Sequence, residues 1–272
     1  MVVLKILVTN DDGIYSQGLY ALAKNLKEIG DVYIIAPDRE RSATGHAITL
    51  HHPLRIEKIK FFDTNIPAWS INGTPSDCVK LAVEDFLEQK PDMIFSGINR
   101  GPNLGTDVLY SGTVSAALEG SILGIPAIAL SLTSYENNDY SYAGEFAKKI
   151  ALKVKENNLP KSTILNINIP NLKKDEIKGV AITKLGIRKY QNSFIKRKDP
   201  RGQIYYWLAG EVIEENLDED TDVGAVKNDM ISITPIHLDL TDFKAIDVLK
   251  TWNLDNSRHY RYNTLNLKIK ER

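Results

Sequence analysis

The sequence predicts an α/β protein, with a Rossmann-like, doubly wound and mostly parallel sheet followed by a β-rich C-terminal region. Short segments rich in Val, Ile and Leu alternate with segments whose apolar residues recur at helical spacing. Strands that are apolar throughout are typical of a parallel sheet that helices cover on both faces. After about residue 179 the helical spacing is no longer found, which predicts a different architecture for the rest of the chain.

The alternation begins with an apolar run over residues 2–8. Leu19, Leu22 and Leu26 then recur at the spacing of one helix face, within a helix expected over 16–29. Residues 31–36, DVYIIA, form the next buried strand. The same criteria predict strands at 92–96, 127–132 and 164–169, and helices at 76–88, 113–123 and 142–156.

Two stretches depart from this pattern. Residues 47–71 alternate between polar and apolar side chains, which predicts an antiparallel, hairpin-type extension. Beyond residue 179, strands are expected in segments 180–186, 204–215 and 230–238. We therefore expect a Rossmann-like catalytic domain over residues 1–178, and a β-rich region and arm over 179–272 that serves oligomerisation.

Charged runs separate the predicted C-terminal strands. Residues 195–202 are basic and residues 214–222 are acidic. Solvated turns explain both runs, and pairing across a subunit interface is the alternative. The polar and basic tail, 258–272, is expected to be an arm that reaches a neighbouring subunit.

Composition excludes several classes of protein. The 34 Lys and Arg residues balance 35 Asp and Glu residues, so no global field would draw the chain onto a nucleic-acid polymer or an anionic membrane. The single cysteine, Cys78, permits neither a disulfide framework nor a cysteine-based zinc site. Because the sequence also shows no signal peptide or membrane span, we expect a soluble, cytoplasmic protein.

Reactive side chains gather in the loops that follow the predicted strands. In open parallel sheets, ligands bind beyond the carboxyl ends of the strands. These loops contain residues 9–13, 37–46, 97–103 and 111–113, and all are rich in oxygen ligands or backbone donors.

Asp11 and Asp12 are the central candidates. Two adjacent carboxylates at the end of a buried strand repel each other unless a cation lies beside them. Together with the hydroxyl of Ser42 and the amide oxygen of Asn99, they form an all-oxygen set that suits Mg²⁺ or Mn²⁺ better than zinc. A turn and helix cap is the alternative explanation for Asp11, Asp12 and Gly13.

Ser111, Gly112 and Thr113 lead directly into a predicted helix. The unpaired N–H groups and the dipole at such a helix start favour a phosphate, although capping alone also explains these residues. Asn10 and Asn99 are further candidates for phosphate contact, and Asn103 for substrate contact. His46 is a weaker candidate, because a histidine beside an extended segment more often packs or lies on the surface.

Several motifs together resemble the survival protein SurE family, the stationary-phase-survival 5′-nucleotidases. These motifs are NDDG at 10–13, APDRERSATGH at 36–46, NGTPSDCVK at 72–80, SGINRGPNLGTD at 96–107, YSGTVSAALEG at 110–120 and ITPIH at 233–237. The resemblance implies a phosphatase that acts on nucleoside 5′-monophosphates, with 3′-nucleotides and polyphosphate as further substrates. It implies one divalent cation per subunit, Mg²⁺ or Mn²⁺, held by Asp11, Asp12, Ser42 and Asn99. It also implies a homodimer or homotetramer with exchanged C-terminal elements.

The mechanism that we expect uses a water molecule as nucleophile, oriented by Asp11 or Asp12. An aspartyl-phosphate phosphatase is a rival, but such enzymes typically have Asp-x-Asp and not adjacent aspartates. A non-catalytic nucleotide-binding regulatory module is the alternative from another class. A dinucleotide oxidoreductase is disfavoured, because NDDGIYSQG lacks the glycine-rich turn that admits a pyrophosphate.

Overall fold

The computed structural model describes residues 3–213, 218–252 and 254. The chain separates into two compact units, Met1–Leu238 and Asp239–Arg272. The first unit contains the sheet and every candidate residue named above. The described part of the second unit contains one helix, α6 (Phe243–Lys250).

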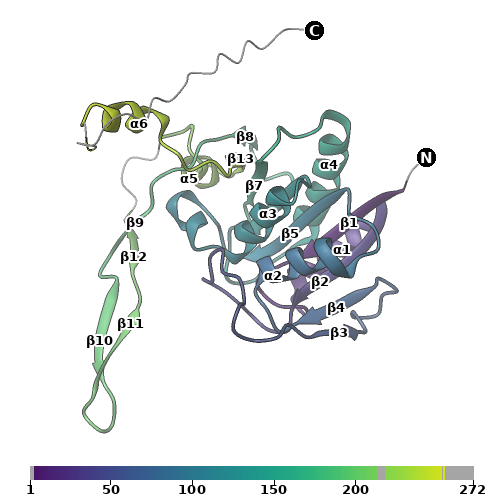
Figure 1. Cartoon of the computed structure of the whole chain (residues 1–272), viewed down its shortest axis with the longest axis horizontal. Helices are drawn as coiled ribbons and strands as arrows, with labels where there is room; N and C mark the ends of the chain where they lie inside the picture. Colours follow the sequence, from purple (N-terminus) through teal and green to yellow (C-terminus); the bar gives the residue numbers. More distant parts are fainter. Residues whose placement is uncertain (1–2, 214–217, 253, 255–272) are drawn as a thin grey trace. The chain divides into compact units, whose positions relative to one another are not determined.

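A nine-stranded sheet forms the centre of the first unit (Figure 1). Its strands, in spatial order, are β3 (Ile56–Ile59), β4 (Ala68–Ile71), β2 (Gly30–Pro37), β1 (Leu4–Thr9), β5 (Met93–Arg100), β6 (Ala127–Leu132), β7 (Thr163–Ile169), β13 (Met230–His237) and β8 (Gly179–Ile182). The six strands from β4 to β7 are mutually parallel. Strand β3 is antiparallel to β4, and β13 is antiparallel to β7. The predicted α/β, mostly parallel sheet is confirmed.

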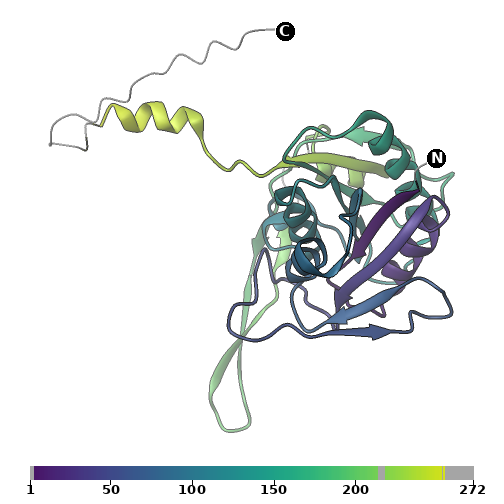
Figure 2. The same ribbon diagram turned by 45° about the vertical axis from the view of Figure 1, so that its right-hand side comes forward.

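Helices cover both faces of this sheet (Figure 2). Helices α1 (Gln17–Leu26) and α4 (Ser141–Asn157) bury their apolar residues on one face, and α2 (Pro75–Leu81) and α3 (Gly112–Ile122) on the other. The strands supply both cores because successive side chains alternate between the faces. Ile6 and Val8 belong to the first core and Leu7 to the second.

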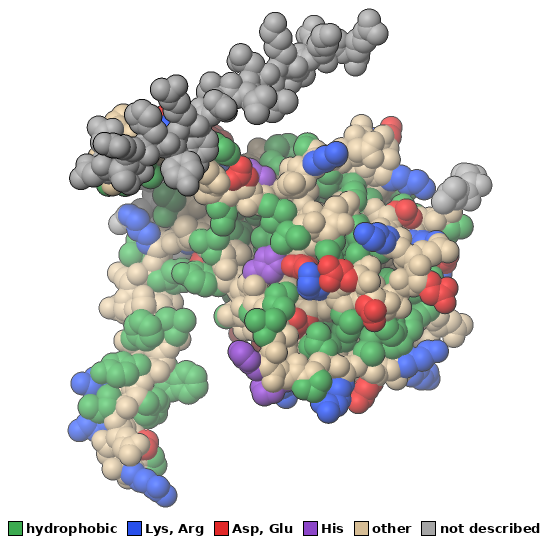
Figure 3. Space-filling model, viewed as in Figure 1, with side chains coloured by type: hydrophobic (Ala, Val, Ile, Leu, Met, Phe, Trp, Pro, Cys, Tyr) green, Lys and Arg blue, Asp and Glu red, His purple; other side chains and the backbone are tan. Residues whose placement is uncertain are grey.

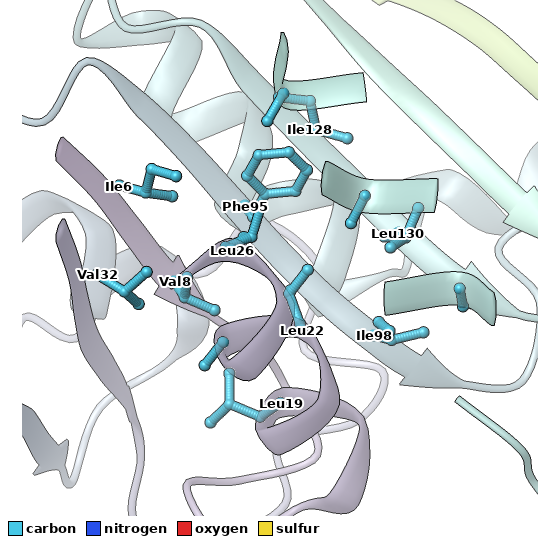
Figure 4. Packing of buried hydrophobic residues seen from close by; sticks show 14 of the residues in the cluster. Ile6, Val8, Leu19, Leu22, Leu26, Val32, Phe95, Ile98, Ile128 and Leu130 are labelled. Carbon is cyan, nitrogen blue, oxygen red and sulfur yellow. The ribbon is translucent and has the colours of Figure 1, made fainter. Parts of the chain in front are cut away.

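Helix α1 shows how the sequence forms one of these layers. Ser16 caps the helix by accepting a hydrogen bond from the backbone N–H of Leu19. Leu19, Leu22 and Leu26 then face the sheet and are fully buried, as Figure 4 shows. At about 25 cal/mol per Å² of apolar surface, each leucine contributes roughly 2 kcal/mol to stability.

Strand order reverses between β1 and β5. The chain leaves β1 towards β2 on one side, and later returns to pair β5 with the other side of β1. The loops that follow β1 and β5 therefore run in opposite directions. Open α/β sheets bind ligands in the crevice between such loops, at the carboxyl ends of the strands. Residues 10–13 and Asn99 lie at this switch point.

Strands β8 and β13 complete the same sheet as the N-terminal strands, so the sheet continues past residue 178. The strand predicted over 204–215 divides into β11 (Ile204–Leu208) and β12 (Glu211–Ile213). These pair with β10 (Phe194–Lys198) and β9 (Lys189–Gln191) in two small sheets. The basic run 195–202 begins within β10, so a simple turn is the wrong description of its first half.

Helices do not stop at residue 179, and that expectation is wrong. Helix α5 (Asp222–Lys227) and α6 follow, in segments too short or too polar to show a clear helical period. Asp222, at the end of the acidic run, begins α5 and is fully buried. Residues 214–217 of that run, and the predicted arm 258–272, lie outside the described residues.

The ribbon of β10 and β11 exposes apolar side chains on both of its faces. Phe194 opposes Leu208 on one face, and Ile195 opposes Trp207 on the other, and all four are exposed. Figure 3 shows hydrophobic side chains along this ribbon with basic side chains among them. We call residues 194–208 the β-ribbon. Across the described residues, no helix is both long and apolar enough to cross a membrane.

Candidate active site

Asp11 follows β1 directly and lies against the start of α3. Its side chain is only 5% exposed, and its Oδ1 accepts a hydrogen bond of 2.5 Å from the hydroxyl of Thr113. A Cβ atom at Gly112 would lie 2.9 Å from the Asp11 Oδ2 atom. Glycine at position 112 therefore permits the carboxylate to approach the helix N-terminus closely.

Asp12 connects the same loop to the end of β5. Its Oδ2 accepts a 3.0 Å hydrogen bond from the backbone N–H of Arg100, the residue after Asn99. The side chain is half-buried. This bond brings Asp12 and Asn99 to the same edge of the sheet, as the strand-end argument predicts.

Burial places both carboxylates in an unfavourable setting for negative charge. Burial raises the pKa of Asp11, although hydrogen bonds from Thr113 oppose the shift. Burial and the neighbouring charge of Asp11 raise the pKa of Asp12 to about 7. Ion pairs in the neighbouring loops join Arg41 to Asp38 and Arg100 to Glu40, and within the described residues none includes Asp11 or Asp12.

Ser42 lies in the loop that follows β2, close to Asp11. The backbone N–H of Arg41, the preceding residue, donates to the carbonyl of Asp11 at 2.7 Å. Ser42 itself is exposed, and its hydroxyl donates to Glu40 at 2.7 Å. Glu40 is a third carboxylate near the aspartates, since its charge contributes to the raised pKa of both. The sequence interpretation missed Glu40, although its place in the same loop was a usable signal.

Asn99 lies at the end of β5, after an irregularity in the strand. The register with β6 shifts between Ser96 and Asn99, and the Gly97–Ile98 peptide bond is cis. Gly97 has a φ of +139°, and a Cβ there would meet the carbonyl oxygen of Leu130 at 2.2 Å, so only glycine fits. The Asn99 amide donates to the carbonyl of Gly101, and no hydrogen bond to its Oδ1 is found within the described residues.

Ser111 is the N-cap of α3, accepting a 3.0 Å hydrogen bond from the N–H of Val114. Capping, the simpler explanation for this residue, is therefore present. Gly112 and Thr113 form the first turn beside Asp11, and both are buried. The helix start thus lies next to the carboxylates, where the sequence places the phosphate site.

Asn10 and Asn103 lie in the loops but are used to brace them. The Asn10 amide donates to the carbonyl of Gly13 and to the hydroxyl of Ser16. Asn103 bonds through its backbone and side chain to three buried residues, Ser131, Asn166 and Asn168. Both side chains therefore brace the loops, and the phosphate contact of Asn10 and the substrate contact of Asn103 stay predictions.

The loop between Asn103 and Ser111 is also fixed from the C-terminal side. It contains η2 (Gly105–Leu109), whose Asp107 accepts hydrogen bonds from Arg188 at 2.6 Å and from Tyr190 at 2.5 Å. The buried Asp222 accepts from the backbone N–H groups of Gly105 and Gly186, at 2.7 and 2.8 Å. Residues beyond 179 therefore position the segment that leads into α3.

The donors at this edge fit a hard divalent cation. Two carboxylates, a hydroxyl and an amide oxygen are the ligand types that Mg²⁺ and Mn²⁺ accept. Among the described residues, no group of three or more His, Cys, Asp or Glu side chains is arranged to hold a metal. That finding agrees with the candidate set, because only two of its four members are acidic.

Comparison with known proteins identifies the family. A family model described as "Survival protein SurE" matches residues 6–192. The chain belongs to the survival protein SurE family. All the predicted SurE motifs except ITPIH lie within the matched residues.

Relatives of this SurE-family chain match it over nearly its whole length. The 5′-nucleotidase SurE of Alkaliphilus metalliredigens (strain QYMF) is 53% identical over 253 residues, which are 93% of this chain and all of the relative. That of Heliobacterium modesticaldum (strain ATCC 51547 / Ice1) is 51% identical and covers 92% of each chain. A crystal structure of the SurE protein from Aquifex aeolicus has a TM-score of 0.81 at 44% identity, and covers 92% of this chain and 99% of that one.

Proposed function

We propose that this chain is a divalent-cation-dependent 5′-nucleotidase that hydrolyses nucleoside 5′-monophosphates. The curated SurE relatives, about half identical over most of the chain, carry the name 5′-nucleotidase. The observation that carries the proposal is the buried Asp11, beside Asp12 and against the N-terminus of α3. A non-catalytic nucleotide-binding module would need the anion site, but it gives no reason for the paired aspartates.

In this proposal one Mg²⁺ or Mn²⁺ ion per subunit is held by Asp11, Asp12, Ser42 and Asn99. When bound, the cation would neutralise charge on the phosphoryl oxygens and lower the pKa of a water molecule. The burial of Asp11 and the absence of ion pairs to either aspartate in the described residues support this assignment.

The protein side chains would orient the reaction. Asp11 or Asp12 would align the attacking water and accept its proton, while the water oxygen forms a bond to phosphorus and the ester P–O bond breaks. The N–H groups of Gly112 and Thr113 and the amide of Asn99 would hold the phosphoryl oxygens. Thr113 has a second role, because its hydroxyl fixes the orientation of Asp11.

We extend the proposal to assembly, location and substrate range. The exposed apolar β-ribbon supports a homodimer or homotetramer in which C-terminal elements are exchanged. A single cysteine, buried and unpaired, is consistent with the cytoplasm. 3′-Nucleotides and polyphosphate are proposed as further substrates, because the phosphate site at α3 does not itself select a leaving group.

The decisive experiment is phosphate release from a panel of nucleoside monophosphates, with EDTA treatment followed by addition of Mg²⁺ or Mn²⁺. We expect activity to be lost with EDTA and restored by the cation. Asp12→Asn should keep the fold, because an amide oxygen can still accept from Arg100, yet reduce kcat by about 1,000-fold or more. Circular dichroism and thermal unfolding serve as the control, and full cation-supported turnover by this variant would contradict the assignment.

Trapping of a phosphoenzyme, together with the configuration at phosphorus, separates direct water attack from the aspartyl-phosphate mechanism. Solvent oxygen enters the released phosphate in both mechanisms, but direct attack inverts a chiral phosphorus and leaves no trapped adduct, whereas two displacements through an aspartyl-phosphate retain the configuration. Isolation of an acid-stable adduct on Asp11 or Asp12 would support the rival mechanism.

A further inference from the structure

The loop that carries Ser42 has no helix or strand of its own. Residues 38–55 connect β2 to β3 without regular secondary structure. Backbone hydrogen bonds of a helix or sheet therefore do not fix the position of Ser42. Its position depends on individual contacts between this loop and the elements around it.

Several contacts hold this loop, and they include hydrogen bonds from Arg41 to the carbonyl of Asn72 and from Thr74 to the carbonyl of Ala47. Near its start, the N–H of Arg41 donates to the carbonyl of Asp11. In its middle, the N–H of Gly45 donates to the carbonyl of Tyr110 at 3.1 Å, and His46 contacts Glu119. Further along, Thr49 bonds to the carboxylate of Asp77 at the start of α2.

His46 joins this loop to the body of α3, beyond the first turn of the helix. The His46 Nε2 atom lies 2.8 Å from Oε2 of Glu119. Glu119 is 4% exposed, and Lys80 of α2 lies 3.4 Å from its other oxygen. The hydrogen bond with His46 is the main reason that the pKa of Glu119 is lowered, so the carboxylate is charged. A buried charge of this kind needs its partners, which makes the contact costly to break.

We propose that Glu119 and His46 are positioning residues that fix the Ser42 hydroxyl at the cation site, an inference that rests on the proposed function. Helix α3 would then contribute to the site at two points along its length. Its first turn faces Asp11, and Glu119, about 9 Å further along the helix at 1.5 Å per residue, anchors the loop. His46 is four residues from Ser42, so loss of its anchor loosens one end of the segment that carries the ligand, while the contacts of Arg41 and Gly45 remain.

The two positioning residues affect the binding of the cation and not the hydrolysis step. Ser42 would otherwise have to be ordered when the cation binds, and that ordering lowers affinity. We therefore expect His46→Ala to weaken Mn²⁺ binding by about 5- to 20-fold, while kcat at saturating Mn²⁺ and the KM for nucleotide change less than about 2-fold.

Isothermal titration of Mn²⁺ into the full chain, without nucleotide, tests this directly. His46→Gln, which can still donate to Glu119, should bind Mn²⁺ almost as tightly as the wild type. Glu119→Ala, which removes the acceptor, should resemble His46→Ala. Glu84→Gln is the matched control, because Glu84 pairs with the same Lys80 at 3.2 Å but does not contact His46, and it should leave affinity unchanged.

Combination with Ser42→Ala tests whether His46 acts through Ser42. The double variant Ser42→Ala with His46→Ala should bind Mn²⁺ no more weakly than Ser42→Ala alone, whereas independent effects would add. Additive losses, or wild-type affinity in His46→Ala, would overturn the positioning role and leave the cation site intact. A raised KM for nucleotide with unchanged Mn²⁺ affinity would instead make His46 a substrate contact. Failure of the wild type to bind Mn²⁺ would overturn the cation site itself, and the inference with it.

Discussion

Asp12 has a pKa of about 7 in the folded protein, well above its ordinary value of 3.8. Between these two values the folded chain holds a proton that the unfolded chain releases. Proton uptake by Asp12 therefore stabilises the fold at low pH, and this contribution is lost as the pH rises through 7. The cause is burial, followed by repulsion from Asp11.

We predict that the cation-free protein loses about 2 kcal/mol of unfolding free energy from this group between pH 5 and pH 7.5, at about 1.4 kcal/mol per unit of pKa shift. Urea unfolding in EDTA at both pH values, compared between the wild type and Asp12→Asn, isolates the contribution. The variant should lose less stability over this range. Equal pH dependence in the two proteins would show that Asp12 titrates normally.

At the scale of single residues, the sequence predicted where reactive groups gather but not what each group contacts. Asp11, Asp12 and Asn99 could be placed together because they follow parallel strands that are neighbours in the sheet. The partners of Glu119 could not be predicted, because its contact with His46 spans 73 residues and depends on the path of an irregular loop. Bracing by Asn103 was hidden for the same reason, because its partners lie 28 to 65 residues away, whereas the partners of Asn10 are local.

At the scale of elements, local apolar pattern was sufficient for the parallel strands and their helices. It was not sufficient for the C-terminal half. Strand β13 pairs with β7, and β8 pairs with β13, although these strands are far apart in the sequence. The local spacing of apolar residues does not predict such pairings. Short helices such as α5 carry too few turns to show a helical period, and α5 is set by the Thr221 cap and by its packing.

Asp222 joins two elements at the site, and its removal provides a test at this scale. Asp222→Ala leaves the N–H groups of Gly105, Gly186 and Val223 without their acceptor. At about 1–3 kcal/mol for each unsatisfied buried group, we expect the unfolding free energy to fall by several kcal/mol. Hydrogen exchange of residues 105–113 should become faster, and kcat/KM should fall.

Asp220→Asn is the matched control for that prediction. Asp220 pairs with Lys184 at 2.8 Å, but both side chains are more than half exposed, so the substitution should leave the unfolding free energy nearly unchanged. Unchanged exchange at residues 105–113 in Asp222→Ala would show that the loop is held by its other contacts.

At the scale of the whole molecule, the β-ribbon is the surface that the proposed oligomer would cover. An isolated two-stranded ribbon is marginally stable in water, and this one exposes Phe194, Trp207 and Leu208. The proposed oligomer would cover these side chains. Their apolar character was visible in the sequence, but the sequence could not show that both faces of the ribbon are open.

We predict that light scattering during size-exclusion chromatography will give a mass at least twice that of the 30.5 kDa chain. Trp207→Glu should reduce that mass, because a charge would be placed in the covered surface. Leu152→Glu, at a comparably exposed position on α4, should not. A wild-type mass of one chain would contradict the proposed assembly.

Residues 186–190, which precede the β-ribbon, are joined to the loop before α3 through two carboxylates, Asp107 and Asp222. In the proposed assembly, therefore, contact between subunits would also affect the order of the active-site loop. Capture of the ribbon by a neighbour would steady residues 188–190, and through Asp107 the loop that leads into Ser111. Dilution that separates the subunits would then lower turnover per molecule.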